Sequence, residues 1–428
     1  MIVFLTFLLF LKSAISIISI ENQTKSIEFD LDKCTYSGFI NLIGSYICPI
    51  QVQVGSPSQQ LTLSLAINKI LPDQLIQTGM SYILSHECTQ KNKCISLFGT
   101  KQFGSAFNSE LSNSLNKTGI KYQNMGNSTL ISIIGEYQSD LFQISQEIEQ
   151  EIRIQFILID SMWTFMGFQV GILNFERHNK NNLILQGYLQ NKLKTPKFAI
   201  ATENRVGKFI YDQIPESWDK AIQIPTKSTD LWDLKVTGLL LGEKEVLPLA
   251  HFQSIEFTFF PYTQLPKGIA NYLIKKYPNL LNKADNTVQI KNCELCNCLE
   301  KFDFPDLKIF TEKVMIKLRP QQYFNYNKFS KFNCEFVISS NKLMLSSQFY
   351  EDNPTIFDTQ KGTLSILNSL IFGYLIIILI KCEQFDYRSR NLIVKMNPNH
   401  LSTLTQDTEK SNQILSKIIE QQQNSNIL

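Results

Sequence analysis

YICPIQVQVGSPSQ, residues 46–59, alternates polar and apolar side chains as far as Val54 and then reaches a Gly-Ser-Pro turn. Strict alternation is typical of a strand with one buried face, and a glycine close to a proline marks a change of direction. A second alternating run, Leu61–Leu65, follows at once. The two runs predict a β-hairpin, with the triplet Ala66-Ile67-Asn68 in the loop at the end of its second strand.

Alternation of this kind recurs along the chain, for example in Ile152–Ile159. In the second half, residues 256–266 read EFTFFPYTQLP, and Lys267–Tyr277 after this proline has the spacing of a short helix. The chain has 428 residues, more than a single average domain. These patterns predict an all-β protein with short helices and more than one domain.

The segments 46–68 and 256–266 resemble the two active-site loops of the pepsin-like aspartic peptidases, and the resemblance extends over residues 44–365. The family's flap tyrosine corresponds to Tyr122, and its short cysteine loop to Cys88 and Cys94. The resemblance implies a bilobal pepsin-like fold, in which two related β-barrel lobes with short helices surround a cleft. The lobes would span residues 27–205 and 206–367.

In this family each active-site loop begins with a catalytic aspartate. The two carboxylates share one proton, so that one acts as a base and the other as an acid on a water molecule. The matching positions here hold Ala66 and Phe257, which can neither take nor give a proton. The resemblance therefore implies that no catalytic residue is retained. The residues expected at the cleft and flap are Tyr122, Ile67, Asn68, Thr258 and Phe259.

A substitute carboxylate is the alternative that would preserve peptidase activity. Glu256 is adjacent to Phe257, but successive side chains of a strand point to opposite faces, so it is expected to point away from the cleft. Asp73 lies several residues beyond the first loop, and no Asp-Thr-Gly or Asp-Ser-Gly triplet occurs in the chain. An active aspartic-type endopeptidase therefore remains the alternative hypothesis.

Other chemistries have weaker signals. The four histidines lie in separate contexts, and the chain has no Gly-x-Ser-x-Gly nucleophile motif. A zinc site at Cys293, Cys296 and Cys298 is an alternative to disulfides, but no histidine is near them. The net charge is +3 with scattered lysines and arginines, which favours neither nucleic acid nor a strongly charged partner. We expect no metal and no cofactor.

Cysteine usage is typical of an oxidising compartment. Eight of the nine cysteines precede the apolar segment near the carboxyl end, and an even number in a secreted chain indicates disulfides. The family resemblance implies a Cys88–Cys94 bridge and a bridge from the Cys293, Cys296 and Cys298 cluster to Cys334. The remaining connectivity stays open. The candidates are Cys34, Cys48, Cys88, Cys94, Cys293, Cys296, Cys298 and Cys334.

The amino-terminal apolar run predicts a signal peptide over residues 1–20. Three Asn-x-Ser/Thr triplets, at Asn22, Asn116 and Asn127, are candidate glycosylation sites. Residues 363–380 carry no charge; because their first five resemble the last strand of the second lobe, the predicted transmembrane segment is 368–381. A polar cytoplasmic tail would follow over 382–428. The alternative is a buried closing strand and a peripheral helix.

These features together predict a membrane-tethered pepsin-like homologue in the secretory pathway, with an extracellular or lumenal ectodomain. It would be catalytically inactive and bind extended peptides or a protein partner. Besides the active endopeptidase, a further alternative is a non-catalytic partner or escort of an active relative.

Overall fold

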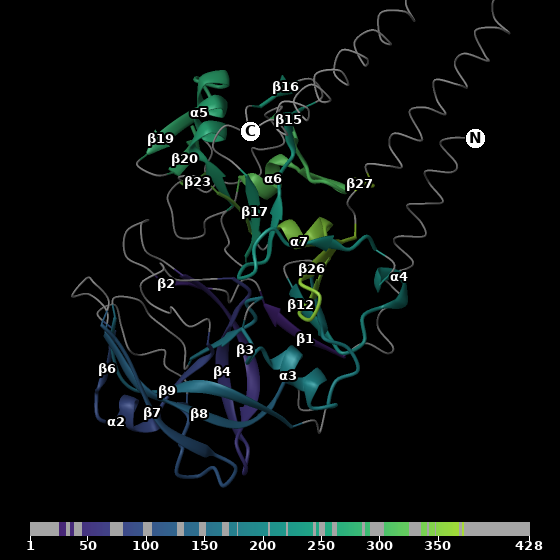
Figure 1. Cartoon of the computed structure of the whole chain (residues 1–428). Helices are drawn as coiled ribbons and strands as arrows, with labels where there is room; N and C mark the ends of the chain where they lie inside the picture. The colour runs from purple at the N-terminus through teal and green to yellow at the C-terminus, as the bar shows by residue number, and fades with distance from the viewer. Residues whose placement is uncertain are drawn as a thin grey trace, which may run out of the picture.

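The structure is a computed structural model. It describes residues 25–30, 35–37, 45–68, 80–96, 105–125, 132–144, 151–164, 171–177, 179–203, 206–219, 221–242, 245–247, 253–258, 263–284, 287–291, 304–324, 335–339, 342–346, 348–367 and 370–371. The described part consists mostly of β-strands arranged in four sheets, which confirms the all-β prediction. In Figure 1 the nine-stranded sheet occupies the lower half, the seven- and five-stranded sheets the upper half, and strands of the six-stranded sheet lie between them.

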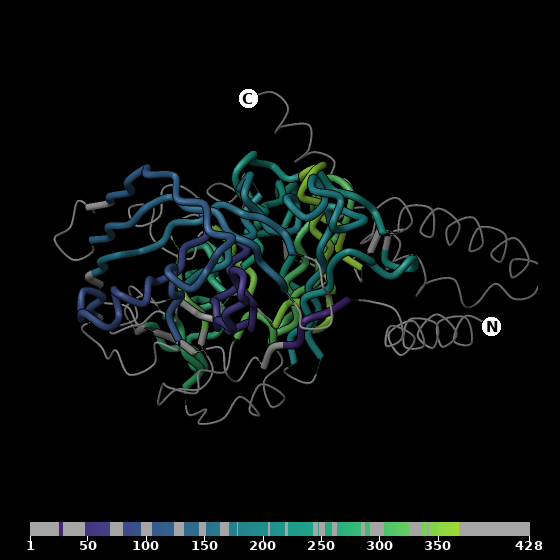
Figure 2. Tube along the Cα trace, turned by 90° about the horizontal axis from the view of Figure 1, so that it is seen from below, coloured from purple at the N-terminus to yellow at the C-terminus, as the bar shows by residue number. Residues whose placement is uncertain are grey.

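The six-stranded sheet joins segments from the beginning, middle and end of the chain. Its order is β1 (Lys25–Asp30), β12 (Val206–Tyr211), β11 (Lys197–Glu203), β25 (Thr355–Asp358), β26 (Thr363–Ile366) and β13 (Ile224–Pro225). Figure 2 shows the yellow-green carboxyl-terminal strands among the teal strands of the middle of the chain. Phe198 of β11 stacks on Phe357 of β25, with ring centroids 4.7 Å apart. This sheet therefore ties the two halves of the sequence together.

The nine-stranded sheet contains the predicted hairpin. Its order is β2 (Thr35–Ser37), β3 (Ser45–Val54), β4 (Gln59–Ala66), β10 (Gly171–Asn174), β5 (Tyr82–Leu84), β9 (Ile152–Thr164), β8 (Ser132–Gln143) and β7 (Asn116–Met125), with β6 (Cys94–Ser96) also paired to β9. The predicted strands Ile50–Val54, Leu61–Leu65 and Ile152–Ile159 are confirmed as parts of β3, β4 and β9. At the hairpin turn Gly55 has φ +85°, a conformation that glycine adopts without steric cost.

Two further sheets form the upper half. The seven-stranded sheet runs β14 (Asp233–Lys235), β17 (Ser254–Phe257), β24 (Leu343–Leu345), β18 (Gln264–Pro266), β23 (Glu335–Ser339), β20 (Thr287–Ile290) and β19 (Leu281–Ala284). The five-stranded sheet runs β16 (Glu245–Val246), β15 (Gly238–Leu241), β21 (Leu307–Phe310), β22 (Val314–Leu318) and β27 (Leu370–Ile371).

The described helices are short, and most contain only one or two turns. They are α2 (His86–Gln90), α3 (Leu183–Leu189), α4 (Glu216–Asp219), α5 (Lys267–Lys276), α6 (Pro320–Tyr323) and α7 (Phe349–Asp352). The helix predicted over Lys267–Tyr277 is confirmed as α5, in which Tyr277 is the C-cap. The Asn182 side chain caps α3 by accepting hydrogen bonds from the Ile184 and Leu185 amides.

Two places in these sheets share one arrangement. At what we call the first crossing, β4 runs parallel to β10, which is also antiparallel to β5. At the second crossing, β17 runs parallel to β24, which is also antiparallel to β18. Parallel neighbours need a long connection, so each crossing brings together segments that are distant in the sequence. The loops that follow β4 and β17 begin at these crossings.

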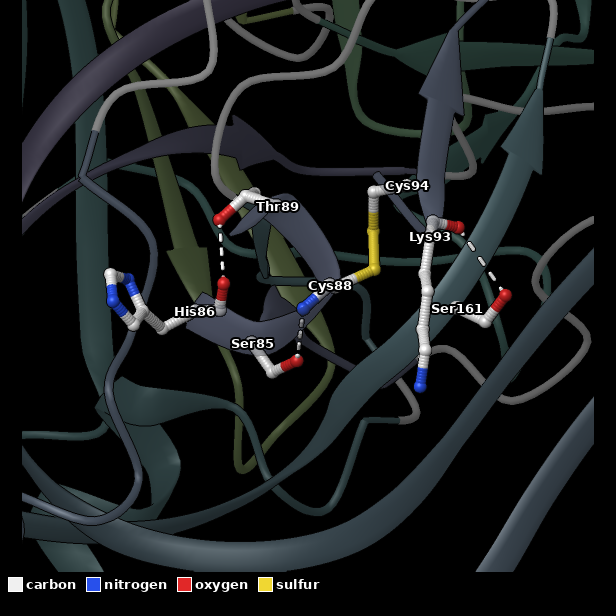
Figure 3. Close-up of a disulfide and its surroundings, with 7 residues drawn as sticks. All are labelled: Ser85, His86, Cys88, Thr89, Lys93, Cys94 and Ser161. Atoms are coloured by element: carbon white, nitrogen blue, oxygen red, sulfur yellow. Dashed lines mark hydrogen bonds between the residues drawn. A yellow bond between two sulfur atoms is a disulfide. The ribbon is translucent and has the colours of Figure 1, made fainter. Parts of the chain in front are cut away.

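A disulfide joins Cys88 of α2 to Cys94 of β6, which confirms the predicted pairing. Figure 3 shows it beside Ser85, whose hydroxyl caps α2 by accepting a hydrogen bond from the Cys88 amide. Cys48 is also disulfide-bonded. Its partner is neither Cys88 nor Cys94, because these two are joined to each other. Cys34, Cys293, Cys296, Cys298 and Cys334 lie outside the described residues.

The predicted signal peptide and cytoplasmic tail lie outside the described residues, as does most of the predicted membrane segment. Leu370–Ile371 are an exception, because they form β27 and pair with Val314 and Met315 of β22. The sequence analysis did not foresee this strand inside the segment 368–381. Within the described part of the chain, no helix is long and apolar enough to cross a membrane.

Candidate functional site

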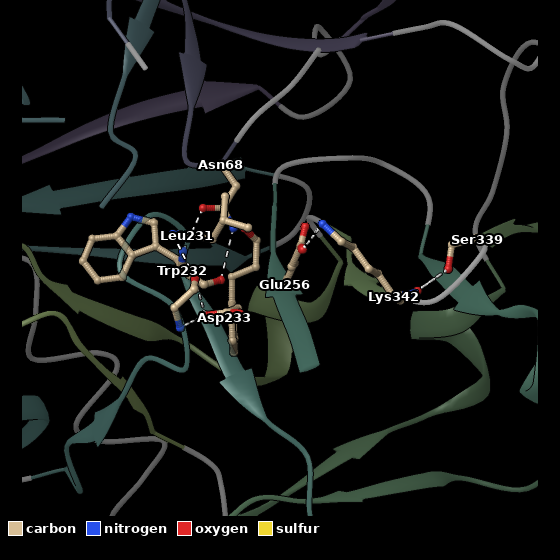
Figure 4. A network of polar contacts seen from close by, with 9 residues as sticks. Asn68, Leu231, Trp232, Asp233, Glu256, Ser339 and Lys342 are labelled. Carbon is tan, nitrogen blue, oxygen red and sulfur yellow. Dashed lines mark hydrogen bonds and ion pairs between the residues drawn. The ribbon is translucent and has the colours of Figure 1, made fainter. Parts of the chain in front are cut away.

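The Asn68 side chain links the first crossing to the second (Figure 4). Its Nδ2 donates to the carbonyl oxygens of Trp232 at 3.1 Å and Phe257 at 2.8 Å. Its Oδ1 accepts a hydrogen bond from the Trp232 amide at 2.9 Å. Two carbonyl acceptors and one N–H donor can be satisfied together only by an amide in this orientation. Asn68 is 3% exposed, so this link is shielded from water.

Backbone hydrogen bonds extend this link on both sides. The Phe175 amide donates to the Ala66 carbonyl at 2.7 Å, and the Phe257 amide donates to the Trp232 carbonyl at 3.0 Å. The Trp232 indole Nε1 donates to the Phe175 carbonyl at 2.8 Å. Trp232 is fully buried. The result is a closed circuit of hydrogen bonds that joins the two crossings.

Ala66 and Phe257, the positions at which the sequence resemblance places the two aspartates, lie inside this circuit. Ala66 and Phe257 are both buried, and neither carries a titratable group. The Phe257 ring packs edge-on against Phe349 and Phe357, with centroid distances of 5.8 and 6.4 Å. The first loop therefore places a methyl group in this buried region, and the second places a packed aromatic ring there.

The neighbouring loop residues are also buried and hydrogen-bonded. Ile67 is buried, as is Thr258, whose hydroxyl donates to the Leu345 carbonyl at 2.8 Å. The structure therefore brings Ile67, Asn68 and Thr258 together in the interior between the two crossings. Phe259 lies outside the described residues.

Tyr122 lies on β7 in the long β7–β8 hairpin, opposite Gly135. Its ring packs edge-on against Tyr137 at a centroid distance of 5.8 Å. Tyr82 of β5, which the sequence analysis did not single out, lies close enough to interact with it. Burial raises the pKa of the Tyr82 hydroxyl well above its ordinary value, and Tyr122 raises it further. Tyr82 therefore stays neutral and cannot act as a base at ordinary pH.

Glu256 is adjacent to Phe257 on β17, so their side chains lie on opposite faces of the sheet. Glu256 is held by an ion pair with Lys342 (Figure 4). Its Oε1 lies 2.6 Å from the Lys342 Nζ, and its side chain is buried while that of Lys342 is half exposed. Its strand partner is Asp233, whose Oδ1 accepts hydrogen bonds from the amide and the hydroxyl of Ser228, both at 2.9 Å. The second crossing thus has two carboxylates on the face opposite Phe257, each with its own partner.

Sequence reasoning missed Asp233, Lys342 and Trp232 as members of this region, because strand register and long-range pairing alone bring them there. Asp73, the other candidate substitute, lies outside the described residues. In the described ranges no group of three or more His, Cys, Asp or Glu side chains is placed to hold a metal ion.

Comparison with known proteins adds no relative. A scan against protein-family models finds no match, and a search of curated proteins finds no matching sequence.

Proposed function

We propose that this chain is a pepsin-like aspartic peptidase homologue that has lost peptidase activity and binds extended peptides or a protein partner. The observation that carries the proposal is the set of three buried hydrogen bonds made by the Asn68 side chain. They join the loop after Ala66 to the backbone of Trp232 and Phe257. In an active relative these loops would present carboxylates to a water molecule. Here they present a methyl group, an aromatic ring and an amide that is already fully hydrogen-bonded.

Three features support the bilobal fold of this family. The two crossings repeat one parallel arrangement in two different sheets. The six-stranded sheet combines strands from both halves of the chain, as a sheet between two lobes would. The long β7–β8 hairpin carries Tyr122, in the part of the chain that corresponds to the family's flap.

Loss of activity follows from the chemistry of the buried region. General acid–base catalysis on a peptide needs groups that exchange protons within hydrogen-bond reach of the substrate. Ala66 and Phe257 have none, and Glu256 lies on the opposite face in contact with Lys342. For Glu256 to act in catalysis, its ion pair with Lys342 would have to break and its side chain would have to reach the other face of the sheet. The alternation of side chains along a strand opposes this movement.

Binding does not require the lost carboxylates. An extended peptide can add to a protein as an extra strand, so that main-chain hydrogen bonds give affinity and side-chain pockets give specificity. In the proposed fold such a peptide would lie beneath the β7–β8 hairpin, which carries Tyr122. The alternative partner is an active relative that the chain masks or escorts.

The Cys88–Cys94 disulfide supports a location in the secretory pathway, because such bonds form and persist in oxidising compartments. The proposed membrane tether over 368–381, with a lumenal or extracellular ectodomain, depends on the sequence pattern alone. Carbonate extraction of membranes from cells that express the full chain would test the tether: retention in the membrane pellet supports it, and release contradicts it.

The test of the function is a cleavage and binding assay with the full chain, purified in detergent with its disulfides intact. A diverse peptide library is incubated from acidic to neutral pH, with and without a statine-type inhibitor, and analysed by mass spectrometry. We expect no inhibitor-sensitive cleavage and saturable retention of a subset of peptides. Inhibitor-sensitive cleavage would overturn the proposal, while the absence of both activities would favour the protein-partner alternative.

The E256Q variant distinguishes the active-enzyme hypothesis further. If Glu256 were a substitute catalytic carboxylate, E256Q would abolish any cleavage. The control variant E110Q removes an exposed carboxylate far from the crossings in sequence, and it should leave any cleavage unchanged.

A further inference from the structure

The free edge of β7 carries a glycosylation motif in an accessible position. Of the three Asn-x-Ser/Thr triplets, Asn116-Lys117-Thr118 is the one within the described residues, at the start of β7. Asn116 is exposed, and its side chain makes no hydrogen bond to any described residue. Its amide nitrogen is therefore available for modification.

The strand that follows Asn116 is irregular. The register of β7 against β8 shifts between Lys117 and Lys121, and Gly119 within this bulge has φ +71°. The Thr118 hydroxyl donates to the Tyr137 carbonyl and accepts from the Ile120 amide at 3.2 Å. The Lys121–Glu136 ion pair at 2.8 Å fixes the strand on the side of β8. These polar contacts thus face β8, and none of the described strands pairs with the outer edge of β7.

The outer edge of β7 could pair with a strand of another chain. Among the described strands β7 pairs only with β8, so its other edge offers unpaired backbone groups to a neighbouring chain. Ile120 on the same strand is 58% exposed, which adds an apolar contact. Natural proteins protect long edge strands with charges, bulges or a cover. β7 has the bulge and the lysines, and a bulky hydrophilic group at Asn116 would supply the cover.

We propose that Asn116 carries an N-linked oligosaccharide that shields the free edge of β7. The co-reactant is an oligosaccharide linked to a lipid diphosphate. The Asn116 Nδ2 forms a bond to the first sugar carbon, the bond from that carbon to the diphosphate oxygen breaks, the lipid diphosphate leaves with the electron pair, and the amide loses one proton. The inference rests on the secretory route of the proposed function.

The test is site-specific occupancy in the full chain expressed in a eukaryotic host and purified in detergent. Residues 1–20 are replaced by a proven signal sequence in one version and kept in another. Enzymatic deglycosylation in heavy-oxygen water converts an occupied asparagine into labelled aspartate, which mass spectrometry locates. We expect labelled aspartate at position 116. An unlabelled Asn116 in folded protein delivered by the proven signal sequence overturns the inference.

The version with its own amino terminus tests the secretory route separately. If that version stays unmodified while the version with the proven signal sequence is labelled at position 116, the site is supported and the secretory route fails. The two failures are therefore distinguishable.

Matched variants test the shielding. N116Q should lose one glycan-sized step in gel mobility and show more light scattering on concentration, whereas T118S keeps both the motif and the hydroxyl and should behave as the parent chain. Equal scattering by N116Q and T118S would overturn the shielding role, even with Asn116 occupied. If N116Q does not accumulate as folded protein, enzymatic trimming of the glycan from the folded parent chain gives the same comparison.

Discussion

The loop after β4 and the loop after β17 occupy corresponding places in two sheets, yet they contribute different things. The first supplies a small side chain, Ala66, and a buried amide, Asn68. The second supplies a large ring, Phe257, together with the Phe257 carbonyl group. The first crossing thus provides directional hydrogen bonds and the second provides volume and acceptors. The comparison shows how two similar strand arrangements can be joined by unlike groups, because the first provides the buried amide and the second provides the carbonyl group that accepts its hydrogen bond.

The register of the parallel strands shows a second difference. At the first crossing Ala66 lies opposite Asn174, whereas at the second Phe257 lies opposite Leu345, the residue before Ser346. Asn174 uses its Oδ1 to accept a hydrogen bond from the Glu176 amide at 2.7 Å. Ser346 instead lies 3.2 Å from the Thr263 hydroxyl. The first crossing is therefore braced within its own loop and the second against the next segment of the chain.

The substitution N68D should have the largest effect at neutral pH. A carboxylate would face the carbonyl oxygens of Trp232 and Phe257 with no proton to donate, and a buried charge without a partner costs about 3–5 kcal/mol. The same repulsion and burial raise the folded-state pKa of the introduced carboxyl group above its unfolded value of about 3.9. The folded state then binds more protons than the unfolded state. The loss of stability should thus be smallest near pH 4 and increase as pH rises towards 7.

Denaturant unfolding of N68D and the parent chain across this pH range measures the effect. The control is N113D, which introduces the same charge at an exposed asparagine and should show no comparable pH-dependent loss. A pH-independent difference between N68D and the parent chain would contradict the assignment of the Asn68 amide to two carbonyl acceptors.

The substitution F257A tests the contribution of volume at the second crossing. Removal of a fully buried phenylalanine ring costs about 3–5 kcal/mol through lost burial and the cavity left behind. F257L should recover more than half of this loss. A66G at the first crossing removes a single methyl group, so it should cost about 1 kcal/mol. Urea unfolding of the three variants measures the ratio, and equal costs for F257A and A66G would contradict the unequal roles of the two crossings.

Removal of the Cys88–Cys94 disulfide tests how much this bond stabilises the nine-stranded sheet at a place away from the first crossing. The double variant C88A/C94A should lose about 2 kcal/mol, because the bridge closes a short loop and constrains the unfolded chain only modestly. Thermal unfolding of the double variant and the parent chain under oxidising conditions checks this, because reduction would also break the disulfide of Cys48. Equal stability of the two chains would show that α2 holds its place without the bridge.

Local signals explain what the sequence predicted. The alternation in Ile50–Val54 and Leu61–Leu65 is a property of neighbouring residues, so both strands could be located before the structure was known. The same holds for α5, which follows Pro266, and for the short loop between Cys88 and Cys94. The absence of an acidic group at Ala66 and at Phe257 is likewise visible in the sequence.

Long-range pairing explains what it missed. Asn68 and Trp232 are 164 positions apart, and nothing in either segment indicates that the side-chain amide of one will accept from the backbone of the other. The strand β27 is a similar case, because Leu370 pairs with Met315 through register alone within an apolar stretch that also fits a membrane segment. The hydrophobic pattern of a segment predicts that it is buried, but it does not indicate which other segment buries it.

The smallest effect is expected at Lys342, which pairs with Glu256 on the face of the second crossing opposite Phe257. K342M would leave the buried Glu256 carboxylate without its partner, and an unpaired buried acceptor costs about 1–3 kcal/mol. The lower end of that range applies, because Lys342 is half exposed and solvent screens the pair. The charge-conserving variant K342R should keep most of the stability, and the double variant K342M/E256Q should recover part of the loss. Unfolding of all three in low and high salt measures the pair. If K342M lost stability equally with E256Q present, the loss would come from the lysine stem and not from the ion pair.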